Sequence, residues 1–275
     1  MAVINTNVAA TLTANALAQN ERASTQALER LSTGLRINSS ADDAAGMAMA
    51  NTMTAQMKGL NMAVKNANDA ISMIQTADGA AIEIGDMLQR MRELAVQAAN
   101  GTLDGSTDQD QLDLEYQQLI TEIGRVGDNT QWNGSNLIDD SAGSSGTVTY
   151  QIGADASQTM TVDFGDLSDD GDLGLTGDVQ DITNATAAIS NIDTALTALN
   201  TQRATYGAAI NRLEHTVDNL SNIAMNTEAS LSRIQDADYA AETTELSRTQ
   251  IVAQAGTAML AQANQQAQSV LALLK

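Results

Sequence analysis

The sequence contains no cysteine and no proline, and its aromatic residues are one Trp, one Phe and four Tyr among 275 residues. Without cysteine the chain cannot form a disulfide framework, a thiolate metal site or a cysteine nucleophile. Without proline its helices can run long and unkinked, and few aromatic side chains are available for the core of a large enzyme. The composition therefore favours long helices packed in thin layers.

Basic residues are also scarce, because 13 Lys and Arg stand against 34 Asp and Glu and give a net charge of -21. Nucleic acids and anionic membranes bind basic surfaces, so neither is an expected partner. No apolar run approaches the roughly 18 residues of a membrane span. The opening residues MAVINTNVAATL lack a basic region followed by an apolar core. We therefore expect no cleavable signal peptide, and the sequence by itself predicts a cytoplasmic protein.

Residues that could carry chemistry are isolated. His215 is the only histidine and has no second His or Cys with which to share a metal ion, so an exposed or interface position is the better interpretation. The residues from Asp166 to Gly171 resemble the start of a calcium loop, but its twelfth position would be Gly177 where a bidentate Glu is required. The motifs of serine hydrolases, zinc proteases and phosphate-binding loops are missing. We predict no enzyme, no metal and no cofactor.

Both ends of the chain carry a heptad pattern of apolar residues. Residues 247–275 are almost uncharged, and their 3–4 spacing predicts a helix whose narrow seam packs on another helix. Residues 3–35 repeat the spacing, with Asn7, Glu21 and Ser24 as polar members. Such helices are stable only when packed, so we expect the two ends to pair. The predicted packing residues are Leu17, Leu28, Leu31, Leu35, Leu246, Leu260, Val270 and Leu274.

The middle of the chain predicts three further helices, at about 43–100, 106–126 and 181–234, and a β-hairpin formed by 147–152 and 160–164. Half of the acidic residues lie between Gly101 and Asp181, where the only base is Arg125, so we expect this stretch to be a solvated surface and not a core. The predicted fold class is mainly α (α+β), a long antiparallel helical bundle with coiled-coil termini and a small β-hairpin insert. The predicted domains are 1–42 and 235–275 (inner core), 43–142 and 181–234 (outer core), and 143–180 (acidic insert).

Several motifs together resemble bacterial flagellin, over about residues 1–140 and 185–275. They are LERLSTGLRINS at 28–39, QRMRELAVQAAN at 89–100, SRIQDADY at 232–239 and LAQAN at 260–264. The resemblance implies a structural subunit that polymerises into the extracellular filament used for motility, exported without a cleavable signal peptide. It implies terminal helices that pair, and that become ordered on assembly. It also implies several partners: further copies of the chain, the flagellar type III export apparatus, an export chaperone at the C-terminus, the filament cap and hook-junction proteins, and the vertebrate Toll-like receptor for flagellin.

The resemblance also assigns a surface for subunit and receptor contacts. Its residues are Gln89, Arg90, Arg92, Glu93, Leu94, Gln97 and Glu115. The insert is short, so the outer domains of larger flagellins are expected to be absent, and deleting residues 270–275 is expected to abolish filament growth. Two alternatives stay open: a hook–filament junction protein, which has similar ends, and an intracellular helical-bundle scaffold or binding module.

Overall fold

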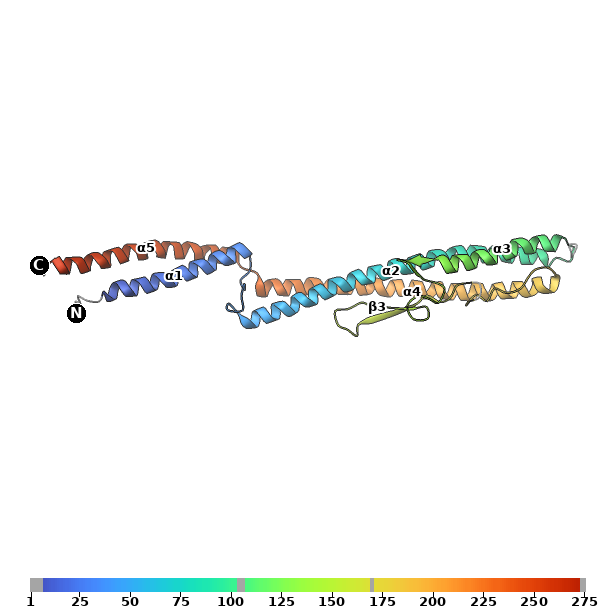
Figure 1. Cartoon of the computed structure of the whole chain (residues 1–275), viewed down its shortest axis with the longest axis horizontal. Coiled ribbons are helices and arrows are strands. Elements are labelled where there is room, and N and C mark those ends of the chain that lie inside the picture. Colours follow the sequence, from blue (N-terminus) through green and yellow to red (C-terminus); the bar gives the residue numbers. More distant parts are fainter. Residues whose placement is uncertain (1–6, 103–106, 169–170, 273–275) are drawn as a thin grey trace. The chain divides into compact units, whose positions relative to one another are not determined.

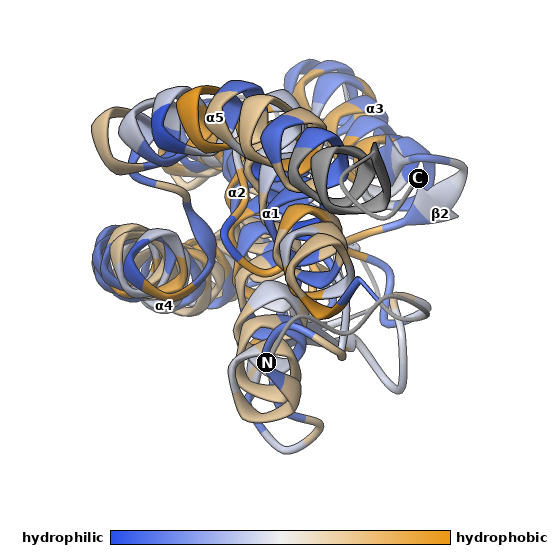
Figure 2. Ribbon diagram, turned by 90° about the vertical axis from the view of Figure 1, so that its left-hand side faces the viewer, coloured by the Kyte–Doolittle hydropathy of each residue, from blue (hydrophilic) through white to orange (hydrophobic). Residues whose placement is uncertain are grey.

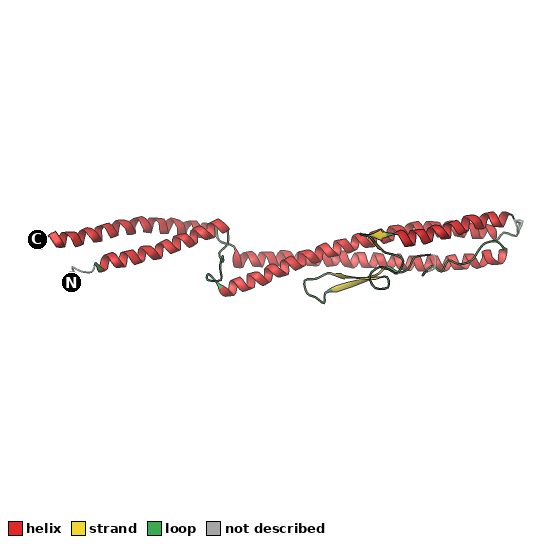
Figure 3. Ribbon diagram, viewed as in Figure 1, coloured by secondary structure: helices red, strands yellow, loops and turns green. Residues whose placement is uncertain are grey.

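The computed structural model describes residues 7–102, 107–168 and 171–272, with side chains to residue 265. The chain divides into two compact units: unit 1 comprises residues 1–55 and 226–275, and unit 2 comprises residues 56–225. The elements in chain order (Figures 1 and 3) are α1 (Val8–Thr33), α2 (Ala44–Ala98), α3 (Asp108–Asn129), β1 (Gln131–Trp132), β2 (Ser135–Asn136), β3 (Thr147–Gln151), β4 (Thr159–Asp163), α4 (Ile182–Gln235) and α5 (Tyr239–Ala272). The predicted helices are thus present, with ends shifted by a few residues, and the fold is mainly helical as predicted.

In unit 1, α1 and α5 lie side by side and antiparallel. The Asn7 side-chain amide donates to the Ala263 carbonyl oxygen at 3.1 Å, and at the other end of the pair the Tyr239 hydroxyl donates to the Leu31 carbonyl oxygen at 3.2 Å. Asn7 also caps α1 by accepting from the Ala10 amide, and α1 ends where Gly34 takes a left-handed conformation, with φ of 74°. The predicted pairing of the two ends of the chain is confirmed.

The predicted seam of α1 is only half correct. The heptad position that holds Leu17, Ser24 and Leu31 is half-buried, as expected. The second position is wrong by one residue, because Asn20 and Ala27 are buried whereas Leu28 is 52 % exposed. Small side chains let the backbones of α1 and α5 approach closely. If Leu28 pointed into the seam in place of Ala27, it would hold the two backbones apart. Leu35 is half-buried beyond the end of α1.

On α5 the predicted frame agrees with the structure as far as side chains are described. Half-buried positions recur at Leu246, Ala253, Gly256, Leu260 and Ala263. Thr249 adds a fully buried position that the apolar pattern did not include. The side chains of Val270 and Leu274, and that of Val3 on the other end, lie outside the described residues.

Unit 2 is built on antiparallel packing of α2 against α4, with α3 beside them. Two ion pairs join the long helices: Arg92 Nε lies 2.7 Å from Asp193 Oδ1, and Arg203 Nε lies 2.9 Å from Asp78 Oδ1. One large core and a small cluster of Leu60, Ala63 and Leu220 lie in this unit. On the helices, the largest fully buried members of the large core are Ile74, Ile84, Leu88, Met91 and Leu94 on α2, Tyr116 and Ile123 on α3, and Tyr206 on α4. Their helical spacing is the pattern that predicted these helices.

The insert forms the predicted hairpin, with β3 and β4 paired from Thr147–Asp163 to Gln151–Thr159. The expectation that the acidic stretch from Gly101 to Asp181 contributes no core is wrong, as the insert within it shows. Alternate residues of β4 are buried, and Phe164 lies 5.9 Å from Tyr206, measured between ring centroids, while the Tyr206 hydroxyl donates to the Phe164 carbonyl oxygen at 2.5 Å. The insert contributes these buried members of the core: Met160, Val162, Phe164, Leu167, Leu173, Leu175 and Val179. The acidic residues stand between them, so a low average hydropathy conceals an apolar face.

Candidate functional site

The α1–α5 pair carries large apolar side chains on its outside. Leu12 is 72 % exposed, Val8 65 %, Ile251 66 % and Met259 63 %. Figure 2 shows hydrophobic segments on both helices of the pair. A helix pair that leaves several large apolar side chains outside its seam presents a surface suited to a further partner.

Charge is absent from the half of the pair that carries these side chains, because α1 has no ionised side chain before Glu21. After Arg248, α5 carries no ionised side chain up to its last described residue. The polar groups inside the pair are Asn20, which is buried, and Arg30, whose Nη1 lies 3.0 Å from Glu242 Oε1. These groups are directed to partners within the pair, and the exposed charges of Glu21, Arg22 and Glu29 lie further along α1. The half of the pair before Glu21 on α1 and after Arg248 on α5 is therefore uncharged on its outside.

A second candidate surface lies on unit 2, where α2 meets α3. Arg90 Nη2 lies 2.8 Å from Glu115 Oε1, and Arg90 Nη1 lies 3.0 Å from Glu93 Oε2. The hydrogen bonds to Glu115 and then Glu93 raise the pKa of the Arg90 guanidinium. Gln89 and Gln97 are exposed on the same helix. We call the exposed residues Gln89, Arg90, Glu93, Gln97 and Glu115 the Arg90 surface.

Two further residues of the predicted contact set lie elsewhere. Arg92 is directed to Asp193 of α4, and its hydrogen bond raises the pKa of Arg92 and lowers that of Asp193. Leu94 is 1 % exposed and belongs to the core of unit 2, so the expectation that its side chain lies on the contact surface needs correction. Its neighbours in the motif face outward, while position 94 falls on the buried stripe of α2.

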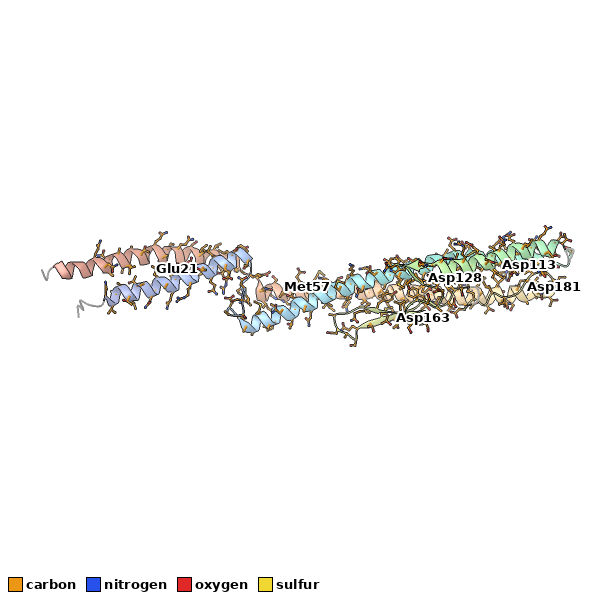
Figure 4. The ribbon with its side chains drawn as sticks, viewed as in Figure 1. Glu21, Met57, Asp113, Asp128, Asp163 and Asp181 are labelled. Atoms are coloured by element: carbon orange, nitrogen blue, oxygen red, sulfur yellow. The ribbon has the colours of Figure 1, made fainter. Side chains whose placement is uncertain are left out.

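A buried carboxylate on α3 was not anticipated. Asp113 is 7 % exposed, and its Oδ1 accepts from the Val179 amide at 3.0 Å while its Oδ2 accepts from Gln180 Nε2 at 2.9 Å. Figure 4 shows Asp113 on α3 and Asp181 near the start of α4. The carboxylate holds the segment before α4 against α3. An isolated Asp in a helical sequence gives no signal of this role, because the partner segment lies more than sixty residues further along the chain.

No cluster of three or more His, Cys, Asp or Glu side chains with the geometry of a metal site occurs in the described part of the chain. Of the loop that resembles a calcium site, residues 169 and 170 lie outside that part. No described helix is long and apolar enough to cross a membrane. The features that stand out are therefore surfaces for macromolecular contact.

Comparison with known proteins identifies both ends of the chain. The model of the bacterial flagellin N-terminal helical region matches residues 4–143, and that of the C-terminal helical region matches residues 189–274. The flagellin of Halalkalibacterium halodurans is 46 % identical over 277 residues, which cover 99 % of this chain and 100 % of the relative. The flagellin of Bacillus subtilis is 42 % identical over 303 residues, with 99 % of each chain covered.

Solved structures agree with the sequence matches. The crystal structure of Bacillus cereus flagellin is similar with a TM-score of 0.50 and 38 % identity, covering 61 % of this chain and 94 % of that one. A putative flagellar hook-associated protein from Vibrio parahaemolyticus has a TM-score of 0.59 at 12 % identity, covering 71 % of this chain and all of that one, which shows a shared fold alone. Full-length similarity is to flagellins, and the chain therefore belongs to the bacterial flagellins, the structural subunits of the flagellar filament.

Proposed function

We propose that this flagellin polymerises by burying the outer apolar face of the α1–α5 pair against neighbouring copies. As a flagellin it is a non-enzymatic subunit that polymerises with itself into the extracellular filament used for motility. The observation that supports this route is the exposure of Leu12, Val8, Ile251 and Met259 on the uncharged half of the helix pair. Identical subunits in repeated head-to-tail contact form open helical polymers.

This burial would contribute several kcal/mol to each subunit's association. Fully burying a Val, Leu, Ile or Met side chain stabilises by roughly 1.5–3 kcal/mol. Since these four side chains are about two-thirds exposed, covering each contributes about 1–2 kcal/mol, or roughly 4–8 kcal/mol per subunit. The strong net charge of -21 opposes close approach of copies, so a neutral contact face is needed.

The Arg90 surface is the second part of the proposal. Its exposed side chains supply a guanidinium shared between two carboxylates, with amide groups on either side. Such a polar, preorganised patch fits the edge of a subunit contact. The same exposed residues are the ones that we expect the vertebrate Toll-like receptor for flagellin to contact, whereas Leu94 contributes only by supporting α2 from the core.

The remaining partners follow from the same apolar helix. Before assembly, the exposed Ile251 and Met259 of α5 would favour premature polymerisation. An export chaperone that covers α5 would prevent it, and release at the type III export apparatus would return the helix to the filament end. The filament cap and the hook-junction proteins would then meet the same terminal pair. We retain the five-part division predicted from sequence as the description of these roles.

The test is seeded polymerisation of purified full-length chain. Leu12→Ser and Ile251→Ser should each raise the critical concentration about 5- to 30-fold, since about 1–2 kcal/mol of burial is lost and 1.4 kcal/mol is tenfold. Gln19→Ser is the matched control, because Gln19 is exposed on α1 but polar, and it should leave the critical concentration unchanged. Filaments growing equally well from the two apolar variants and the control would refute this assembly route.

A further inference from the structure

The α1–α5 pair keeps one axial register along its whole described length. Between the Asn7–Ala263 and Leu31–Tyr239 contacts, α1 advances by as many residues as α5 recedes. Along the seam, Leu17 and Leu31 follow the small residues Ala10 and Ser24 on α1, and Leu246 and Leu260 lie one heptad on either side of Ala253 on α5. Apolar side chains can repack, so this alternation alone does not exclude a slide by one heptad.

Leu17 and Gly256 make a contact that distinguishes the native register further. A β-carbon placed on Gly256 would lie 3.3 Å from Leu17 Cδ1, which is tighter than an ordinary van der Waals contact. The positions one heptad before and after Gly256 are Thr249 and Ala263, and both carry a β-carbon. In either slipped register Leu17 would therefore collide with the β-carbon of Thr249 or Ala263, whereas in the native register it faces Gly256, which has no β-carbon. Glycine weakens a helix relative to alanine. Its position opposite Leu17, the one large seam residue in this part of α1, is explained by the space that Leu17 needs.

Two polar contacts act in the same direction. Asn20, one turn beyond Leu17, is 8 % exposed and donates from Nδ2 to the Thr249 carbonyl oxygen at 2.7 Å. Arg30 Nη1 lies 3.0 Å from Glu242 Oε1, and both side chains are largely buried. Beyond Glu245, α5 has no carboxylate, so a slip that moved Arg30 toward Thr249 would leave its guanidinium without a counter-charge. Polar residues inside a helix seam are known to specify register at a cost in stability.

We propose that Leu17 seated against Gly256, supported by Asn20 and Arg30, selects the single axial register of the α1–α5 pair. A slip of one heptad would displace the outer face of α1 by about 10 Å along α5. The apolar residues that face neighbouring copies would then lie at different heights in different subunits. The inference rests on the proposed function, because its consequence is a uniform contact face in every subunit of the filament.

The absence of native cysteine allows the register to be read by introduced cysteine pairs. The pair Ser24→Cys with Leu246→Cys reports the native register. The pairs Ala10→Cys with Ala253→Cys and Ser24→Cys with Ala253→Cys report slips of one heptad in opposite directions. Filaments are oxidised, and disulfide-linked peptides within one chain are quantified by mass spectrometry, with a non-reducing gel separating them from links between chains.

Each cysteine pair is compared in the unaltered background and with Gly256→Leu. Overpacking of this kind should raise the ratio of slipped to native disulfide about tenfold. Ala255→Leu, which adds the same atoms at the exposed neighbouring position, is the control and should leave the ratio unchanged. The exchange Leu17→Ala with Gly256→Leu moves the large side chain to the other helix and should restore the native disulfide. An unchanged ratio with Gly256→Leu overturns the proposal.

If Gly256→Leu alone forms no filaments, the exchange variant decides the question. Filaments with the native disulfide support the proposal, and failure of the exchange variant to assemble or to regain that disulfide overturns it. The proposed function fails separately, when the unaltered chain forms no filaments under seeding. In that case the same disulfides are measured in the dissolved full-length chain, where a ratio indifferent to Gly256→Leu again overturns the register assignment.

Discussion

Replacing Asp113 by alanine should loosen unit 2 where the segment before α4 is held against α3. The change removes the acceptor of the buried Val179 amide and that of Gln180 Nε2. Hydrogen bonds to a charged group contribute about 1.5–3 kcal/mol each. One of the two partners is only partly buried, so we expect a loss of roughly 3 kcal/mol in the free energy of unfolding. For a unit of this size that lowers the melting temperature by about 6–12 °C.

The assay is urea and thermal unfolding of the full-length chain followed by the fluorescence of Trp132. Trp132 is the only tryptophan and packs against the core of unit 2, so the signal reports this unit. Asp128→Ala is the matched control, because Asp128 is an exposed carboxylate on the same helix (Figure 4), and it should change stability by less than about 0.5 kcal/mol. Asp113→Asn keeps the shape of the side chain but only one of its two acceptor oxygens, so its free energy of unfolding should fall between those of Asp113→Ala and Asp128→Ala. Equal stability of Asp113→Ala and Asp128→Ala would refute the reasoning.

Four further changes test the core and the helices of unit 2. Burial raises the pKa of Tyr116 to about 12, so the stabilising contribution of Tyr116 is complete below the unfolded pKa of about 10 and is lost as pH rises from 10 to 12. Tyr116→Phe should therefore move alkaline unfolding, followed by circular dichroism, to higher pH. A shift of the unfolding midpoint to lower pH would contradict this. Tyr206→Phe leaves the Phe164 carbonyl oxygen without its partner and should cost about 1–3 kcal/mol in urea unfolding, with an unchanged midpoint as the refuting result. Gly79→Ala should stabilise by up to about 1 kcal/mol, because nothing lies within 4 Å of the added atom. The added atom of Gly85→Ala would lie 3.3 Å from Leu199, so this change should gain less in the same assay, and equal gains would show that the contact is irrelevant.

The helices could be predicted because their cause is local. Apolar residues at helical spacing are a sequence signal with direct structural meaning. The pairing of α1 with α5 also followed from composition, since two near-neutral, weakly apolar helices need a partner. What could not be predicted is which of two adjacent residues enters the seam. The pattern favoured Leu28 because it is larger, whereas close approach of the backbones favours Ala27.

The acidic insert shows the converse limit. A count of charges averages over both faces of a strand, but burial is decided residue by residue. Val162 and Phe164 are buried while Asp163 between them is exposed, so the insert completes the core of unit 2 despite its charge. Leu94 was assigned to a contact surface because its whole motif was carried over, although helical geometry turns position 94 inward. In both cases periodicity was the more informative signal, and average composition or motif membership obscured it.

These placements explain why the terminal pair is suited to a polymer. With Leu12 and Leu28 inside the seam, α1 and α5 would bury more apolar surface between themselves and form a more stable isolated pair. At these places the seam instead holds Asn20, Ala27 and Gly256, which contribute little burial but let the backbones approach and distinguish one register from another. In the proposed assembly, the large apolar side chains outside the seam, such as Leu12, contact neighbouring copies. Stability of the subunit and stability of the filament thus draw on the same residues, and each leucine moved into the seam would be expected to strengthen the first at the expense of the second.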